Sequence, residues 1–174
     1  MNEGSTNGVS AHPPAPRVAV LGLGNVLMGD DAFGPYVIRV LHAGWTFPPD
    51  VTVEDVGTPG LDLAPFVADV KALVLIDIVR GTQPPGTMRA HRRDEILKHA
   101  PPPRVSPHDP GVKETLITLE LAGQAPSDVY LVGVVPHDTE MRVGLSEPVR
   151  AAVPVVIEKV LEELARLGCP AVKR

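Results

Sequence analysis

The sequence predicts an α/β fold, a three-layer sandwich in which helices flank a mostly parallel central sheet of about five strands. Two apolar runs, VAVLG at 18–22 and ALVLIDIV at 72–79, have the composition of strands buried on both faces of a parallel sheet. Segments with apolar residues at helical spacing alternate with such strands, and short loops join them. This alternation is typical of a parallel sheet with right-handed crossovers.

The first half of the chain alternates strands with helices. Pro35 suits the first turn of a helix that runs to about residue 43. A strand at 50–55 alternates apolar and polar residues, which favours a place near the sheet edge. A second helix is expected at 61–70, and the strand at 72–79 is the most hydrophobic, so we place it at the centre of the sheet. Four apolar residues of the second helix are expected to face inward: Leu61, Ala64, Phe66 and Val67.

The second half continues the alternation and ends in a long helix. Its earlier expected elements are a short strand at 88–91, a helical turn at 94–99, a helix from Asp109 to Ala122 and a strand at 129–135. The last helix begins at Ser146 or Glu147 and ends at Gly168. Pro154 interrupts its apolar stripe, which predicts either a kink there or a helix that starts near that residue. Arg92 and Arg93 are expected to form a solvated strand end.

Length, composition and charge predict one domain and exclude several classes of protein. Residues 1–16 are mostly small, polar or proline, so we expect a disordered tail followed by a single α/β domain at 17–174. The net charge is −5 and Lys and Arg form no long run, which argues against nucleic acid as a partner. No apolar run approaches the ~20 residues that span a bilayer, and the N-terminus lacks a signal-peptide pattern. Cys169 is the single cysteine, as a reducing cytoplasm would permit, so we expect a cytoplasmic protein. The sequence shows no obvious exposed apolar stripe and no membrane span, so we expect a monomer with no membrane partner.

Acids and histidines follow the predicted strands. Ligands of such sheets gather at the carboxyl ends of the strands. Six residues meet this condition: Asp30, Asp31, Asp55, Asp77, His108 and His137. Asp77 lies within a buried apolar run, so its carboxylate must be hydrogen-bonded, paired or bound to a metal, and a purely structural role at the strand end is equally open. Gly22, Gly24 and Gly29 are expected to allow positive φ and so to aim the first two acids over the sheet edge.

The donor atoms of these residues suit a borderline divalent metal. His108 stands before an expected helix whose positive end favours a neutral, metal-binding imidazole, and a solvated loop histidine is the alternative. Asp77, His108 and an acid of the first loop make an oxygen and nitrogen set that suits nickel or zinc rather than calcium. Asp30 and Asp31 also fit a solvated turn before a helix. His137 is more simply a loop histidine bonded to its neighbour.

The turn after the first strand also begins like a dinucleotide-binding fingerprint. Gly22-Leu23-Gly24 supplies the first two glycines of that motif. Leu27 stands where the third glycine belongs, and two acids follow where a pyrophosphate would meet negative charge. The match is therefore weak.

Seven motifs along the chain occur in the order found in the NiFe-hydrogenase maturation endopeptidases, which the sequence resembles over nearly its whole length beyond the tail. Three are specific: GLGNVLMGDDAFG at 22–34, LIDIV around Asp77 and SPHDPG around His108. The other four are GTPG at 57–60, PPGTM at 84–88, LVGVVP at 131–136 and GLSEPV at 144–149.

The resemblance implies a compact α/β protease domain that removes the C-terminal extension of a hydrogenase large-subunit precursor once nickel has been inserted. It implies that nickel bound in the substrate is the recognition element, and that zinc or cadmium substitutes for it in vitro. Matched motif by motif, the catalytic and metal-binding trio falls on Asp31, Asp77 and His108. The first-loop acid is one methylene shorter here than the Glu found in some members, so Asp30 is a lesser candidate, as are Asp55 and His137.

Two other functions stay open at this point. One is a non-enzymatic module that binds a nucleotide or docks onto a metallocentre during its assembly. The other is a general aminopeptidase, which would hydrolyse short unstructured peptides, an activity that we expect to be absent. Ligand preference separates these possibilities, because only the endopeptidase is expected to respond to nickel or cadmium through His108.

Overall fold

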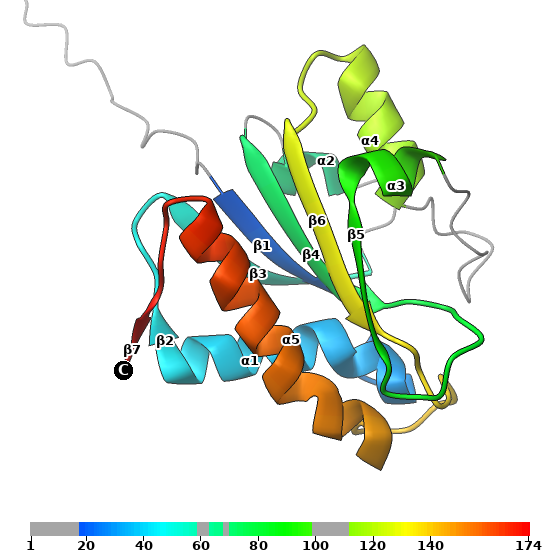
Figure 1. Ribbon diagram of the computed structural model, residues 1–174. Coiled ribbons are helices and arrows are strands. Elements are labelled where there is room, and N and C mark those ends of the chain that lie inside the picture. Colours follow the sequence, from blue (N-terminus) through cyan, green and yellow to red (C-terminus); the bar gives the residue numbers. More distant parts are fainter. Residues whose placement is uncertain (1–17, 59–62, 68–69, 99–111) are drawn as a thin grey trace, which may run out of the picture.

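A central sheet of five strands organises the computed structural model, which describes residues 18–58, 63–67, 70–98 and 112–174 (Figure 1). The strands lie in the order β3-β1-β4-β6-β5, and all pairs are parallel except β5 with β6. Their bounds are β1 Val18–Leu23, β3 Val51–Gly57, β4 Ala72–Ile78, β5 Met88–Arg92 and β6 Asp128–Val134. The mostly parallel sheet, with the most hydrophobic strand at its centre and β3 at one edge, is confirmed.

Helices cover both faces of the sheet and complete the three layers. Successive strand residues point to opposite faces, so Val74 packs in one core and Leu75 in the other. The first core lies beneath α1 (Phe33–Gly44) and α5 (Glu147–Arg166). The second lies beneath three shorter helices: α2 (Ala64–Val67), α3 (Arg93–Lys98) and α4 (Val112–Leu121). Figure 1 shows α1 and α5 together on one side of the sheet.

The helices of the second face depart most from the sequence prediction. α2 spans Ala64–Val67, within the expected 61–70, and Leu61 lies outside the described residues. Val67 is buried as expected, whereas Phe66 is exposed, so its inward orientation was wrong. Leu63 packs in the core instead. The expected start of α4 at Asp109 also lies outside the described residues.

The long helix α5 runs unbroken through its internal proline. It begins at Glu147, so the alternative in which it starts near Pro154 is wrong. Pro154 has no N–H to donate to the carbonyl of Arg150, four residues earlier. Because Pro154 lies on the exposed face of the helix, water can bind that carbonyl instead. Gly168 follows the helix with φ of 76°, as expected for a C-terminal glycine.

Two arginines at the end of β5 and the start of α3 make ion pairs with other elements. Arg92 donates to both carboxylate oxygens of the buried Glu163, at 2.6 and 2.8 Å, and Arg93 pairs with Glu120 at 2.9 Å. Arg92 is exposed at the end of β5, as expected, and the ion pairs of both arginines are an additional feature that the sequence did not reveal. The two arginines join β5 and α3 to helices on opposite faces of the sheet.

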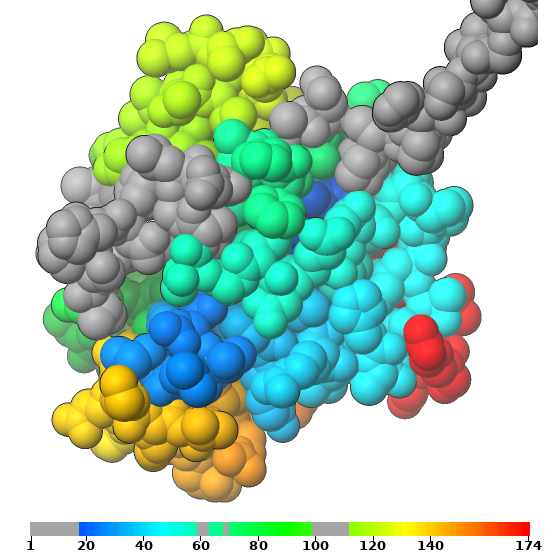
Figure 2. Space-filling model, turned by 180° about the vertical axis from the view of Figure 1, so that it is seen from behind, coloured from blue at the N-terminus to red at the C-terminus, as the bar shows by residue number. Residues whose placement is uncertain are grey.

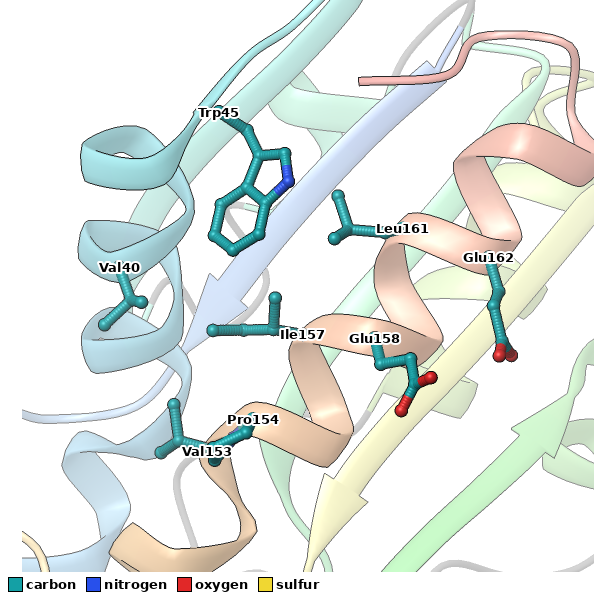
Figure 3. Close-up of a pocket in the computed structure, with 8 residues that line it drawn as sticks. All are labelled: Val40, Trp45, Val153, Pro154, Ile157, Glu158, Leu161 and Glu162. Atoms are coloured by element: carbon teal, nitrogen blue, oxygen red, sulfur yellow. The ribbon is translucent and has the colours of Figure 1, made fainter. Parts of the chain in front are cut away.

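A small second sheet and a hollow lie at the far end of α1. β2 (Trp45–Thr46) pairs antiparallel with β7 (Val172–Lys173). Strands of two residues are too short to leave a recognisable pattern, so the sequence did not predict this pair. Beside Trp45, a hollow of about 500 Å³ opens between α1 and α5 (Figure 3). In the part of the chain that the structure describes, no helix combines the length and hydrophobicity that a membrane span requires.

Candidate functional site

The loop after β1 is packed as closely as glycine permits. Gly24 and Gly29 have φ of 132° and 55°, as predicted. A Cβ on Gly24 would overlap the backbone oxygen of Asp31, so the loop folds back on itself at this residue. Gly22 does not adopt positive φ, contrary to expectation. It is needed for a different reason, because a Cβ there would lie 2.6 Å from the carbonyl oxygen of Gly34 in α1.

The first turn of α1 lies over the ends of the two central strands. A Cβ on Gly34 would overlap the carbonyl oxygen of Leu23 at the end of β1 and would come within 2.5 Å of that of Ile76 in β4. Asp31 precedes this turn in the 3-10 helix η1 (Gly29–Ala32), which contacts β4, and Asp77 directly follows Ile76. The structure thus brings Asp31 and Asp77 to the same carboxyl edge of the sheet, as the sequence predicted.

Asp31 is partly exposed and its orientation is set within its own loop. Its Oδ2 accepts a hydrogen bond of 2.8 Å from the backbone N–H of Asn25. Asn25 in turn accepts from Leu27 through its side-chain oxygen at 3.0 Å and from Met28 through its carbonyl at 3.1 Å. These local bonds fold residues 25–31 into a defined turn that presents the Asp31 carboxylate.

Asp77 is buried at the end of the central strand. Its Oδ1 accepts a hydrogen bond of 2.8 Å from the backbone N–H of Ile78. Gly133 of β6 stands opposite in the register, and a Cβ there would overlap the Asp77 carbonyl oxygen. The backbone of Asp77 is therefore packed closely against β6, and the Ile78 N–H orients its carboxylate at the sheet edge.

Asp30 differs from its neighbour because it is fully buried and faces the loop at 136–146. Its Oδ1 accepts from the Ser146 N–H at 2.6 Å, and its Oδ2 accepts from the Ser146 hydroxyl at 2.8 Å and from the N–H groups of His137 and Asp138 at 2.8 and 3.3 Å. Burial raises the pKa of Asp30, but these hydrogen bonds outweigh it and hold the pKa below its ordinary value. Asp30 thus ties the first loop to the loop before α5.

Ser146 is the residue of this region that the sequence analysis undervalued. It stands at the N-cap of α5, where a serine side chain normally accepts a backbone hydrogen bond from its own helix. Here it makes no such bond, and its hydroxyl donates to Asp30 instead. A serine before Glu-Pro looks like an ordinary cap, so the sequence carried no signal for this long-range contact.

The other predicted site residues occupy different positions. His137 is exposed and contributes its backbone N–H to Asp30. Asp55 is exposed at the end of β3, where its Oδ1 accepts from the Gly57 N–H at 3.0 Å. His108 lies outside the described residues, so the trio with Asp31 and Asp77 stays a prediction. Among the residues that the structure does describe, no three His, Cys, Asp or Glu side chains are grouped to hold a metal.

Comparison with known proteins supplies the family. The family model HycI, hydrogenase maturation protease, matches residues 35–163. The chain belongs to the hydrogenase maturation protease family. It is 35% identical to the hydrogenase 2 maturation protease of Escherichia coli over 91% of this chain and 96% of that protein. It is also 35% identical to the hydrogenase expression/formation protein HupD of Rhizobium leguminosarum, over 93% of this chain and 81% of the relative.

A solved structure of the same family confirms the fold. The hydrogenase maturating endopeptidase HybD from Escherichia coli superposes with a TM-score of 0.82 at 33% identity, covering 91% of this chain and 98% of that one. Family membership makes this chain a hydrolase of peptide bonds that acts in the maturation of a hydrogenase precursor. It favours the endopeptidase over the non-enzymatic module.

Proposed function

We propose that this protease removes the C-terminal extension of the hydrogenase large-subunit precursor after nickel insertion, and that it recognises the nickel carried by that substrate. The observation that supports the proposal is the position of Asp31 and Asp77 at one carboxyl edge of the sheet, with each carboxylate oriented by a backbone N–H. Asp31, Asp77 and His108 are the proposed ligands. Two carboxylates and an imidazole suit nickel, and zinc or cadmium would substitute in vitro.

The charge of the sheet edge suits a cationic substrate centre. Asp31 is partly exposed and Asp77 is buried at the same edge of the sheet, so neither carboxylate is surrounded by bulk water. Asp30 adds a third negative charge, and the backbone N–H groups and the hydroxyl that donate to it are neutral and do not cancel it. A site with this potential attracts a divalent ion held in the precursor. Bound there, the metal would polarise the scissile carbonyl or lower the pKa of an attacking water.

The direct test is processing of the precursor with and without nickel. Purified wild-type protein is incubated with the large-subunit precursor, and the mass lost from its C-terminus is followed by mass spectrometry. We expect cleavage of the nickel-loaded form alone, and a loss of about 100-fold or more in rate for Asp31→Asn, Asp77→Asn and His108→Ala. Asp94→Asn, which changes an exposed acid on α3, is the matched control. Wild-type rates in Asp77→Asn would show that the site is assigned wrongly.

A binding measurement separates the protease from the alternatives. Nickel or cadmium is expected to raise the thermal midpoint of the wild type but not of His108→Ala, because a ligand stabilises only the state that binds it. Tight NAD or flavin binding without a response to these metals would favour the nucleotide-binding module instead. Rapid hydrolysis of short peptides would favour an aminopeptidase. We also propose that the protein acts as a monomer in the cytoplasm.

A further inference from the structure

Four large apolar side chains are exposed on the two loops that Asp30 joins. Val26 and Leu27 in the first loop are 44% and 56% exposed, and Met141 and Val143 in the second are 86% and 80% exposed. None of the four belongs to either buried core. We call these four residues the loop-junction patch. Figure 2 shows the two loops, the first in blue and the second in gold, side by side on one face of the molecule.

Backbone bonds hold the two halves of the patch together. Gly29 donates to the carbonyl of Arg142 at 2.8 Å, and Arg142 donates to that of Leu27 at 2.9 Å. The resulting bridge between Met28 and Arg142 places Leu27 beside Met141 in register. A Cβ on Gly29 would lie only 2.9 Å from the Asp138 carboxylate, so the loops approach as closely as glycine allows.

The loop-junction patch is therefore ordered by backbone hydrogen bonds, and its four exposed side chains contribute to neither buried core. Exposed apolar side chains that are grouped together mark interaction sites more often than scattered ones do. A surface that is already ordered loses little conformational entropy when a partner binds. The four hydrogen bonds to Asp30, two buried and two partly buried, join the two loops that carry the patch and supply that order.

We infer that the loop-junction patch docks an apolar segment of the hydrogenase large-subunit precursor, an inference that rests on the proposed function. The patch is continuous with the candidate site, because Asn25 in the same turn orients Asp31. A precursor segment on the patch would thus lie beside the proposed nickel ligands. A second copy of the chain is a poorer occupant, because a stable dimer buries about 1,200–2,000 Å² and four side chains supply much less.

The double variant Leu27→Ser/Met141→Ser tests the patch with the full-length protein. We expect the KM for the nickel-loaded precursor to rise about 10- to 100-fold while kcat stays within about twofold, because docking contributes affinity rather than chemistry. The dissociation constant for the nickel-free precursor should rise by the same factor. The matched control is Leu121→Ser/Val172→Ser, which removes two exposed apolar side chains from α4 and β7 and should change neither value.

The outcomes separate the docking inference from the nickel proposal. An unchanged KM and dissociation constant in the patch variant would overturn docking while nickel-dependent cleavage stood. Equal cleavage of nickel-free and nickel-loaded precursor would remove the nickel proposal, and a raised KM in the patch variant would still support docking. A wild-type dimer in sedimentation that the patch variant loses, with KM unchanged, would assign the patch to self-association and overturn the inference.

Discussion

Two buried carboxylates, at opposite ends of the sheet, are stabilised in different ways. Asp30 lies beyond the carboxyl end of β1 and accepts its bonds from neutral groups, three backbone N–H groups and one hydroxyl. Glu163 lies beside the start of β6 and accepts from the guanidinium groups of Arg92 and Arg166. Arg166 also pairs with Asp128, and Arg92 stacks 4.2 Å from the centre of the Tyr130 ring.

The difference shows which end of the sheet is suited to a ligand. Neutral donors stabilise the Asp30 charge without cancelling it, so negative potential remains next to Asp31 and Asp77. The two guanidinium groups neutralise Glu163 and join α5 to β5, which makes that end a structural connection. Burial raises the pKa of Glu163, but its bonds to Arg92 and Arg166 outweigh this and lower the pKa to about 2.

Asp30→Asn is expected to have the largest effect on stability of the variants considered. The amide places an NH₂ group against donors that need an acceptor, so the unfolding free energy should fall by about 3 kcal/mol or more in urea titrations. Precursor processing should also fall, because the first loop loses its tie to residues 136–146. A loss below about 1 kcal/mol would mean that the four bonds do not hold the loops.

Glu163→Gln should reduce stability but spare processing. Both arginine side chains are about half exposed and can be rehydrated, so we expect a loss of about 2 kcal/mol in urea titrations. Below the midpoint temperature the specific activity on precursor should match the wild type. A strong loss of activity in the folded variant would contradict a purely structural role for this end of the sheet.

Acid titration of the wild type should show how much the ionised Glu163 carboxylate contributes to stability. Glu163 has a lowered pKa in the folded state, so its stabilisation is complete above the unfolded value of 4.5 and is lost as the pH falls towards about 2. The unfolding free energy should decline by about 2 kcal/mol over this window, and Asp30 adds to the decline in the same direction. In Glu163→Gln the curve should be flatter. An identical slope in both proteins would exclude Glu163 as the source.

Ser146→Ala is expected to have the smallest effect. It removes one of the four bonds to Asp30 and leaves the backbone donors in place, so about 1 kcal/mol should be lost. Ser127→Ala removes an exposed serine hydroxyl that donates to a backbone carbonyl and is the matched control, with a loss below about 0.5 kcal/mol. Equal losses of unfolding free energy in the two variants would indicate that the hydrogen bond from Ser146 to Asp30 stabilises the protein no more than an exposed one does.

The strands were predictable because their signals are local. A buried parallel strand is a nearly continuous apolar run, so β1, β4 and β6 could be predicted from composition even though β4 contains Asp77 and β6 begins with Asp128. The second helix was less predictable, because packing against the sheet, rather than the periodicity of its own residues, decides the bounds and the buried face of such a short helix. Phe66 has the right spacing to face inward, yet Leu63 and Val67 fill the space.

The order of residues along the chain places acids after two parallel strands, and this is enough to bring Asp31 and Asp77 to one edge of the sheet. Residue chemistry alone does not distinguish Asp30 from Asp31, since adjacent aspartates carry the same local signal, and only the motif match favoured Asp31. The tertiary structure shows how their surroundings differ: the Asp30 donors come from residues 137–146, more than 100 positions away, and Asp30 is buried while Asp31 stays partly exposed. Long-range backbone donors have no sequence signature, because every residue except proline carries the same N–H.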